Sequence, residues 1–361
     1  MNFAVNSVTY GTAARLATAA YVLSIGFLLV SIIFANTIVS GQTTTATSPA
    51  NVEGRQRGIE LYRQQKFAEA AKLLQKFLKK NRADDEAWHY LGLSLLHNPK
   101  QIKEASKAFE TALKLRPNFA AARIGLGYSL LLRNKLADAI REAQAGLSLE
   151  SKSADAHFVI GVVRLRTGAR DEALAQAETI IKLDPQYAPG YLLKSQALAT
   201  FFGEALYSRG NESGEERKDR FKQAADALEK YLQLEPNSGD KQALTEQLES
   251  LRFYLASRET RRGHDGPFGG RDVTTKARVI SKPEPSYTES ARKAQVTGTV
   301  VLRAVFASDG TVKHFLVVSG LPYGLTEEAV KAARKIKFTP ATIDGRPVSM
   351  FIQLEYNFNL Y

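Results

Sequence analysis

The chain has 361 residues, 44% of them apolar and 24% charged, which fits roughly two or three globular domains and excludes a wholly disordered chain. It has no cysteine, so disulfides, iron–sulfur clusters, thiolate zinc sites and a cysteine nucleophile are excluded, and its five histidines are too scattered to predict a metal site. The net charge of +12 is spread over predicted helix faces and one connecting segment, without the clustered aromatics of a nucleic-acid-binding module, so we expect no nucleic acid partner.

A long uncharged segment near the N-terminus predicts a membrane anchor. Residues 16–35 are almost entirely apolar, and a helix of this length spans roughly the 30 Å of a bilayer's hydrocarbon. Arg15 precedes the segment and no charge follows it closely, so the positive-inside rule places the N-terminus in the cytoplasm. A cleaved signal peptide is the alternative, although its apolar core is usually about 7–15 residues. The predicted segments are a cytoplasmic N-terminus (1–15), a transmembrane anchor (16–39) and a flexible stem of small polar residues (40–50).

Residues 51–258 contain an internal repeat. Four glycines lie 34 or 35 residues apart, at Gly58, Gly92, Gly127 and Gly161. Alanines and prolines form two further ladders in the same phase, and each proline ends the second helix of a helix pair. The pattern resembles the tetratricopeptide repeat (TPR), in which helix hairpins stack into an α-solenoid. We expect five repeats and a terminal capping helix, with a polar insertion at 203–217.

The TPR resemblance implies a concave face, formed by the first helix of each repeat, that binds a protein or peptide. The alternative is that the same side chains are ordinary core between repeats. By analogy with the family, the face would contain His89, Leu93, Ile124, Tyr128, Phe158, Val162 and Leu192.

The C-terminal region predicts a small α+β domain at 283–361, after a basic, glycine-containing linker at 259–282. Its last strand alternates apolar and polar side chains, so one face of the sheet is core. The predicted elements are a short helix opened by a capping box at Ser286 and Glu289, strands at 298–307 and 311–318 joined by a type I′ turn at Asp309-Gly310, a helix at 325–336 and a strand at 348–358.

This order of elements resembles the C-terminal domain of the TonB family. The motifs that carry the resemblance include Tyr287-x-x-x-Ala291, Gly298-Thr-Val, Asp309-Gly310-Thr-Val, Val318-Ser319-Gly320 and Phe338-x-Pro340-Ala341. The resemblance implies a three-stranded antiparallel sheet packed on two helices. It also implies a single-pass protein of the bacterial inner membrane, with its main body in the periplasm. The expected partners are an outer-membrane TonB-dependent transporter, whose extended TonB box is added to the sheet as a strand, and ExbB–ExbD-like motor subunits.

The last strand is the expected binding edge. Strand addition uses backbone N–H and C=O groups, so it requires few particular side chains. The alternative is that this edge is covered by a loop or by a second copy of the domain. The residues assigned to the edge are Val348, Ser349, Met350, Phe351, Ile352, Gln353, Leu354, Glu355, Tyr356 and Asn357.

The sequence thus predicts a mainly α protein that acts as a TonB-like periplasmic energy transducer or adapter. The alternative is a non-energised envelope scaffold that binds periplasmic proteins or peptides in its TPR groove. The complete set of C-terminal motifs favours the transducer. The anchor favours the scaffold, because TonB transducers carry a Ser and a His one turn apart, whereas here Ser24 is followed one turn later by Leu28. Ser290-x-x-Lys293 lacks the companion motifs of a penicillin-binding site, so we expect no enzymatic activity, cofactor or metal.

Overall fold

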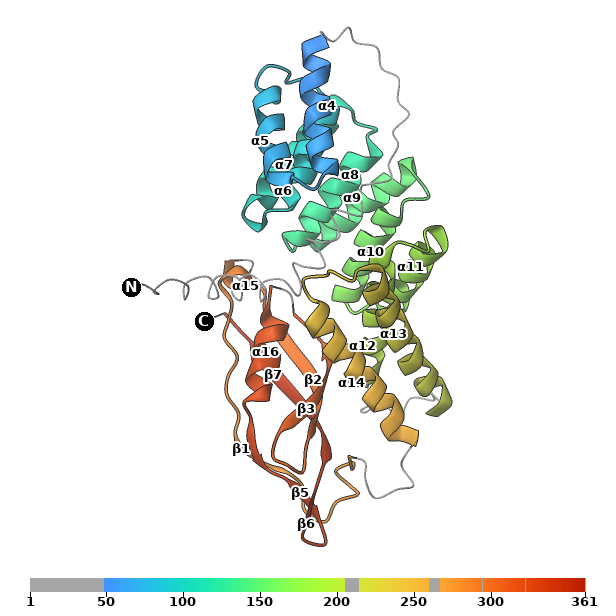
Figure 1. Ribbon diagram of the computed structural model, residues 1–361, viewed down its shortest axis with the longest axis vertical. Coiled ribbons are helices and arrows are strands. Elements are labelled where there is room, and N and C mark those ends of the chain that lie inside the picture. The colour runs from blue at the N-terminus through green and yellow to red at the C-terminus, as the bar shows by residue number, and fades with distance from the viewer. Residues whose placement is uncertain (1–48, 205–213, 260–266, 294, 322, 361) are drawn as a thin grey trace, which may run out of the picture. The chain divides into compact units, whose positions relative to one another are not determined.

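The structure, a computed structural model, describes residues 49–204, 214–259, 267–293, 295–321 and 323–360 (Figure 1). The chain divides into two compact units, with the division at residues 193 and 194 inside one helix. The predicted anchor at 16–39, the cytoplasmic segment before it and nearly all of the stem lie outside the described residues. Among the described helices, none combines the length and apolar character needed to cross a bilayer.

The unit up to residue 193 is a stack of antiparallel helix pairs (Figure 1). Each helix packs on its partner within the pair and on the next pair along the chain, which confirms the predicted TPR-like solenoid. The helices are α4 (Pro49–Arg63), α5 (Phe67–Leu78), α6 (Asp85–Leu96), α7 (Ile102–Leu115), α8 (Ala120–Leu132), α9 (Leu136–Leu149), α10 (Ala154–Arg166) and α11 (Arg170–Leu183), with a short 3₁₀ turn, η1 (Pro99–Gln101).

The glycine ladder marks positions where two helices of a pair approach closely. A Cβ added at Gly92 would lie 2.7 Å from the ring of Phe109, and one added at Gly58 would lie 2.5 Å from Leu74. Both distances are shorter than van der Waals contact, so a larger residue at either position would push the paired helices apart. The 34-residue period therefore records the packing of helix on helix, repeated once per hairpin.

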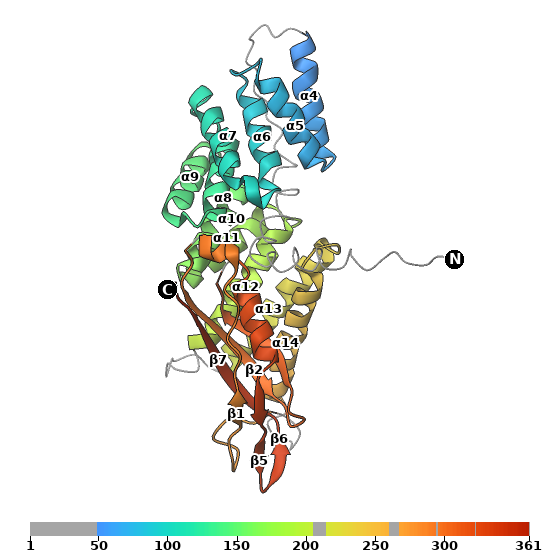
Figure 2. The same cartoon turned by 90° about the vertical axis from the view of Figure 1, so that its left-hand side faces the viewer.

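The second unit begins within α12 (Ala188–Glu204) and contains α13 (Gly214–Leu234), α14 (Lys241–Glu259) and the C-terminal residues (Figure 2). Helices α13 and α14 pack on each other as a hairpin. A three-stranded antiparallel sheet follows, in the spatial order β3 (Val312–Ser319), β2 (Gly298–Phe306) and β7 (Met350–Phe358). Two short ribbons pair β1 (Arg278–Ser281) with β4 (Lys337–Thr339) and β5 (Ala341–Ile343) with β6 (Arg346–Val348).

The main core of the C-terminal domain lies between one face of this sheet and two helices, α15 (Glu289–Lys293) and α16 (Leu325–Arg334). Side chains two residues apart on β2 and β7 point into it, as the alternating pattern predicts. The ring of Phe306 stacks on that of Phe338 at 3.9 Å. The buried set includes Val300, Leu302, Ala304, Phe306, Leu325, Ala329, Ala332, Ala333, Leu354, Tyr356 and Phe358.

Several local predictions were wrong. The predicted linker contains strand β1, and the N–H groups of Thr274 and Thr275 bond to the carbonyl of Thr342, so this segment is packed on the domain. The turn at Asp309 is not type I′, because only Gly310 has a positive φ there and Ala307 closes a three-residue loop on Thr311. The Asp309 carboxylate accepts the N–H of Thr311, which stabilises this three-residue loop.

Two element boundaries also differ from the predictions. Helix α15 is capped by Thr288, whose hydroxyl accepts the N–H of Ala291, rather than by Ser286. The last strand begins at Met350, because Val348 belongs to β6 and pairs with Ala341. The predicted polar insertion at 203–217 is helical at both of its described ends, in α12 and α13.

Candidate functional site: the two edges of the sheet

The three-stranded sheet has two edge strands, β7 and β3, which differ in regularity. Strand β7 pairs with β2 through nine consecutive residues, from Phe358 opposite Gly298 to Met350 opposite Phe306, without a register shift. Strand β3 pairs with β2 through two irregularities, one near His314 and one near Val318. His314 itself has a left-handed backbone with φ 51°. Bulges and unusual backbone of this kind disfavour pairing with a further strand.

The backbone groups of β7 that point away from the sheet can be assigned from its register. Ala307 donates its N–H to the carbonyl of Thr311, so the odd-numbered residues of β2 face β3 and the even-numbered ones face β7. On β7 the even-numbered residues consequently bond to β2, and the odd-numbered ones point outward. In agreement, the N–H of Phe351 donates to the carbonyl of Phe268 at 3.0 Å, and Lys282 Nζ donates to the carbonyl of Glu355 at 2.6 Å.

The ten predicted edge residues do not all lie on the outer edge of β7. Val348 lies in β6, and Ser349 joins it to β7, with its carbonyl accepting the N–H of Phe268. Met350, Leu354 and Tyr356 are buried, with Ile352 partly buried beside them. The outward set is Phe351, Gln353, Glu355 and Asn357, and their side chains lie on the face opposite the main core, as predicted from the alternation.

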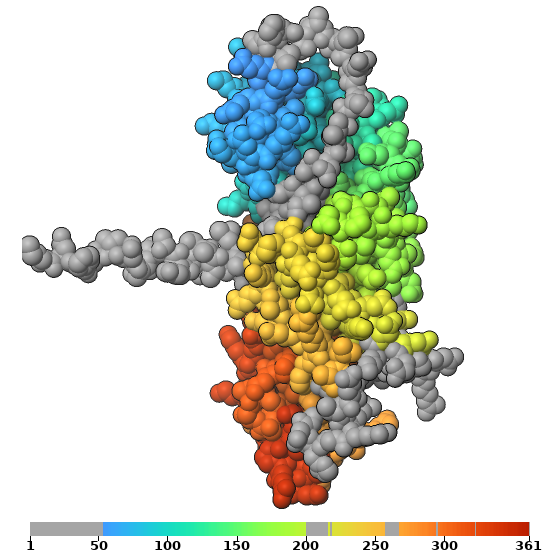
Figure 3. Space-filling model, turned by 45° about the vertical axis from the view of Figure 1, so that its right-hand side comes forward, coloured from blue at the N-terminus to red at the C-terminus, as the bar shows by residue number. Residues whose placement is uncertain are grey.

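Helix α14 covers part of this second face. In the space-filling view the atoms of the α13–α14 region, yellow to light orange, adjoin those of the C-terminal strands, orange to red (Figure 3). Tyr254 is only 3% exposed and its ring lies 5.5 Å from that of Phe351 and 6.3 Å from that of Phe221 on α13. The guanidinium of Arg303, on the central strand, lies 5.3 Å from the Tyr254 ring. Phe253 stacks on His314 at 3.6 Å. The helix therefore contacts all three strands of the sheet.

A cleft of about 660 Å³ runs between α14, β3 and α16, within the size range of ligand sites. Its apolar lining includes Val312, Phe315 and Val330. Burial raises the pKa of Glu327 to about 8, and that of Asp240 to about 7. Neither carboxylate oxygen of Glu327 is exposed to solvent, so this group is a buried neutral acid at pH 7 rather than a ligand-facing charge.

Sequence reasoning missed the packing of α14 on the sheet. The sequence pattern that points to this packing is an apolar stripe at the spacing of one helix face. It consists of Leu244, Leu248, Leu251 and Tyr254, all of which are buried. The stripe predicts that α14 has a buried side, but it is also the pattern of an ordinary capping helix. Nothing in the periodicity identifies a sheet as the partner.

The seven residues assigned to the TPR groove are all buried, each at most 8% exposed. His89 packs among the rings of Tyr90, Phe109 and Phe119, and burial beside Arg116 lowers its pKa to about 3, so it is neutral. Phe158 contacts Tyr187 of the next repeat. This environment favours the alternative of core between repeats, and binding at the groove stays a prediction.

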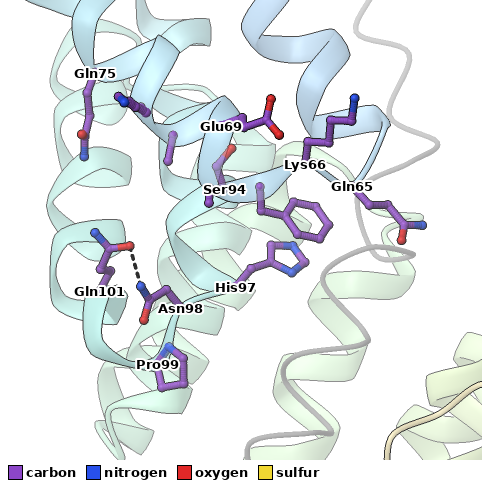
Figure 4. A pocket seen from close by; sticks show the side chains of 13 residues that line it. Gln65, Lys66, Glu69, Gln75, Ser94, His97, Asn98, Pro99 and Gln101 are labelled. Atoms are coloured by element: carbon purple, nitrogen blue, oxygen red, sulfur yellow. Dashed lines mark hydrogen bonds between the residues drawn. The ribbon is translucent and has the colours of Figure 1, made fainter. Parts of the chain in front are cut away.

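A surface cleft of about 600 Å³ opens instead beside the turn between α4 and α5 and the turn after α6 (Figure 4), again within the usual range for binding sites. His97 stacks on Phe67, and burial lowers its pKa to about 3. Asn98 and Gln101, which are joined by a hydrogen bond of 2.9 Å, line the same cleft. None of the seven predicted groove residues lines it.

Within the part of the chain that the structure describes, no three His, Asp or Glu side chains are grouped so that they could hold a metal ion. The electrostatic features there serve packing instead. Tyr187, for example, donates its hydroxyl hydrogen to Asp155 at 2.8 Å between neighbouring repeats, and burial raises the pKa of both groups.

Comparison with protein families finds two matches. The family described as Gram-negative bacterial TonB protein C-terminal matches residues 283–360, and the tetratricopeptide repeat family matches residues 55–101, 100–148 and 133–188. Protein TonB of Vibrio cholerae serotype O1 is 32% identical over 89 residues, which is 24% of this chain and 36% of that protein. Anaphase-promoting complex subunit 3 of Dictyostelium discoideum is 26% identical over 111 residues, 31% of this chain and 11% of that protein. The chain thus spans only a minor part of either relative.

Some solved structures are also similar. MamA of Desulfovibrio magneticus RS-1 is 21% identical, with a TM-score of 0.40 that covers 53% of this chain and 98% of MamA. A thermophilic TPR protein of Thermus thermophilus is 18% identical, with a TM-score of 0.42 that covers 58% of this chain and 99% of that one. The two family matches place a TonB C-terminal domain at residues 283–360 and tetratricopeptide repeats before it, between residues 55 and 188.

Proposed function

We propose that this protein is a TonB-like envelope adapter that binds an extended segment of an outer-membrane TonB-dependent transporter at the outer edge of β7. The repeats provide a second, independent surface for a protein partner. In this proposal residues 16–39 anchor the chain in the inner membrane, and the repeats and the C-terminal domain lie in the periplasm. The protein itself performs no chemistry on its partners.

The observation that carries the proposal is the difference between the two edges of the sheet. Strand addition needs a straight row of outward N–H and C=O groups at a spacing that a second strand can match. Strand β7 pairs with β2 over nine residues without a shift in register, and its outward groups are bonded only at Ser349 and Phe351, by Phe268, and at the Glu355 carbonyl, by Lys282, among the bonds that the structure describes. Strand β3 has two irregularities and a left-handed residue that stacks on α14.

A passive scaffold is the second candidate, and the composition of the anchor favours it. A transducer must couple its membrane helix to a motor, and the family's Ser and His pair is absent, with Leu28 one turn after Ser24. The two candidates share binding at β7 and differ in whether force is applied. Binding is therefore the first property to test.

The test is amide hydrogen exchange in the full-length chain, in detergent, with synthetic peptides that cover the N-terminal segments of candidate transporters. Even-numbered amides of β7 already bond to β2, and Phe351 bonds to Phe268, so we expect new protection at the odd-numbered amides further along, Glu355 and Asn357 above all. A control peptide N-methylated at alternate residues cannot complete the ladder and should give no protection. Peptide binding that leaves these amides unprotected would refute strand addition at β7.

A further inference from the structure

One charged side chain lies directly on the proposed binding edge. The ammonium of Lys282 donates to the outward carbonyl of Glu355 at 2.6 Å and lies 4.4 Å from the ring centroid of Tyr356. A lysine that bonds to a strand's outer carbonyl occupies the acceptor that an added strand would use. Lys282 and an incoming strand therefore compete for the same atom.

The backbone around Lys282 is held in place on both sides. Strand β1 ends one residue earlier, at Ser281, which pairs with Lys337 of β4. Further along, the ring of Tyr287 packs edge-on against Phe358 at 5.8 Å. The contact between Lys282 and β7 thus extends from a backbone that is paired with β4 just before it, although the residues of β1 and Lys282 are exposed.

We propose that Lys282 guards the β7 edge, so that a binding strand must displace its ammonium from the Glu355 carbonyl. The inference rests on the proposed function and assigns to it a residue that sets affinity. A guard is needed because a regular, exposed edge also pairs with other copies of itself. A side-chain guard differs from a bulge in being reversible, since it leaves the strand straight once the lysine swings away.

Removing the Lys282 ammonium should increase the affinity of the β7 edge for a peptide strand. Lys282→Met keeps the aliphatic stem and removes the donor, so Glu355 no longer has to lose a charge-assisted bond when a strand arrives. We expect an uncharged peptide of alternating threonine and valine to bind the full-length variant about three- to tenfold more tightly, the range for one net hydrogen bond. Lys282→Arg retains a donor and should bind the peptide like the natural protein.

A matched control is Lys335→Met, which removes another exposed lysine, the residue at the C-terminal cap of α16. This variant should leave the affinity unchanged. Unchanged or weaker binding in Lys282→Met would overturn the guard. Weaker binding would make Lys282 a direct contact of the added strand instead.

A second measurement separates failure of the guard from failure of the proposed function. Sedimentation velocity of Lys282→Met should show self-association at protein concentrations where the natural protein is monodisperse, because the uncovered edge pairs with itself. If no peptide binds to either protein but the variant self-associates, the guard stands and the transporter-binding proposal fails. If the variant neither binds peptide nor self-associates more than the natural protein, the guard is refuted as well.

Discussion

The two edges of the C-terminal sheet are protected in different ways. Strand β3 is irregular, carries His314 with a positive φ, and is covered on one side by α14. Strand β7 keeps a regular register, is bonded by the backbone of Phe268 where it begins, and is contacted further along at the outer carbonyl of Glu355 by Lys282. Both strands pair with the same central strand, so the difference lies in the edge strands themselves and in the groups that contact them.

The comparison shows how a small sheet can allow strand pairing at one edge and prevent it at the other. Bulges alter the strand permanently, because they change the register of every pair beyond them. The Lys282 side chain, in contrast, occupies one hydrogen-bond acceptor, the Glu355 carbonyl, and leaves the backbone of β7 unchanged. The same protein therefore combines a permanent block on β3 with a removable block on β7.

The largest expected effect comes from removing part of the contact between α14 and the second face of the sheet. Tyr254→Ala deletes a buried ring that contacts Phe351 on β7 and Phe221 on α13. Loss of a large buried aromatic side chain typically costs about 3–5 kcal/mol. We expect the free energy of unfolding of the second unit to fall by about 3 kcal/mol in urea denaturation, since Tyr254 bridges two layers.

The matched control for this variant is Tyr254→Phe. The hydroxyl of Tyr254 is buried and bonds to no described group, so its removal relieves an unsatisfied donor. We expect a stability equal to or up to about 1 kcal/mol above that of the natural protein. A large loss in the phenylalanine variant would mean that the hydroxyl, rather than the ring, holds α14 on the sheet.

The next test attacks the β7 edge itself. Gln353→Pro removes an N–H that points away from β2, so the ladder within the sheet stays complete. An added strand would lose a bond and meet the proline ring, and we expect peptide affinity to fall at least about tenfold, in isothermal titration of the full-length chain. Circular dichroism checks that the fold is retained.

Gln353→Ala is the companion variant, because it removes the side chain and keeps the N–H. Its peptide affinity should stay within about twofold of the natural value, as strand addition relies on the backbone. Equal binding by both variants would move the site away from β7. The β3 edge would then have to be reconsidered.

Much of this architecture could be predicted because its contacts are local. The glycine ladder encodes helix pairs that are neighbours in sequence, such as the pair joined at Gly92 and Phe109. The alternation along the last strand identified which side chains face the core, and β7 follows it from Met350 to Phe358. In both cases one physical period, 3.6 or 2 residues, is visible in the sequence.

The rest depended on contacts between distant segments. Nothing in the apolar stripe of α14 indicates that Tyr254 meets Phe351, almost a hundred residues later. All four residues of strand β1 are exposed, so the strand has no alternating hydrophobic pattern to reveal it. Lys282 is one of many surface lysines in the sequence, and only the register of β7 makes its position informative. The predicted groove residues illustrate a different difficulty. They are buried, and apolar side chains on the first helix of a repeat suit a binding face and a core equally well.

The smallest effect concerns the cleft beside β3. There, a rise in pH should lower the free energy of unfolding. Burial raises the pKa of Glu327 from its usual 4.5 to about 8, so the folded protein holds this proton more tightly than the unfolded chain does. The stabilisation is complete below pH 4.5 and is lost as the pH rises through 8. Asp240 nearby, with its pKa raised to about 7, acts in the same direction, so the two carboxylates repel each other once both ionise.

Urea denaturation between pH 5 and pH 9 measures this effect, with Glu327→Gln as the reference. The glutamine cannot ionise, so the two proteins should be close in stability at pH 5 and the variant should be the more stable at pH 9. Peptide binding at β7 should change little between these pH values, because the cleft borders β3 and not β7. If peptide affinity and stability fell together, ionisation beside β3 would be coupled to strand binding at β7 through α14. The two edges of the sheet would then not be independent.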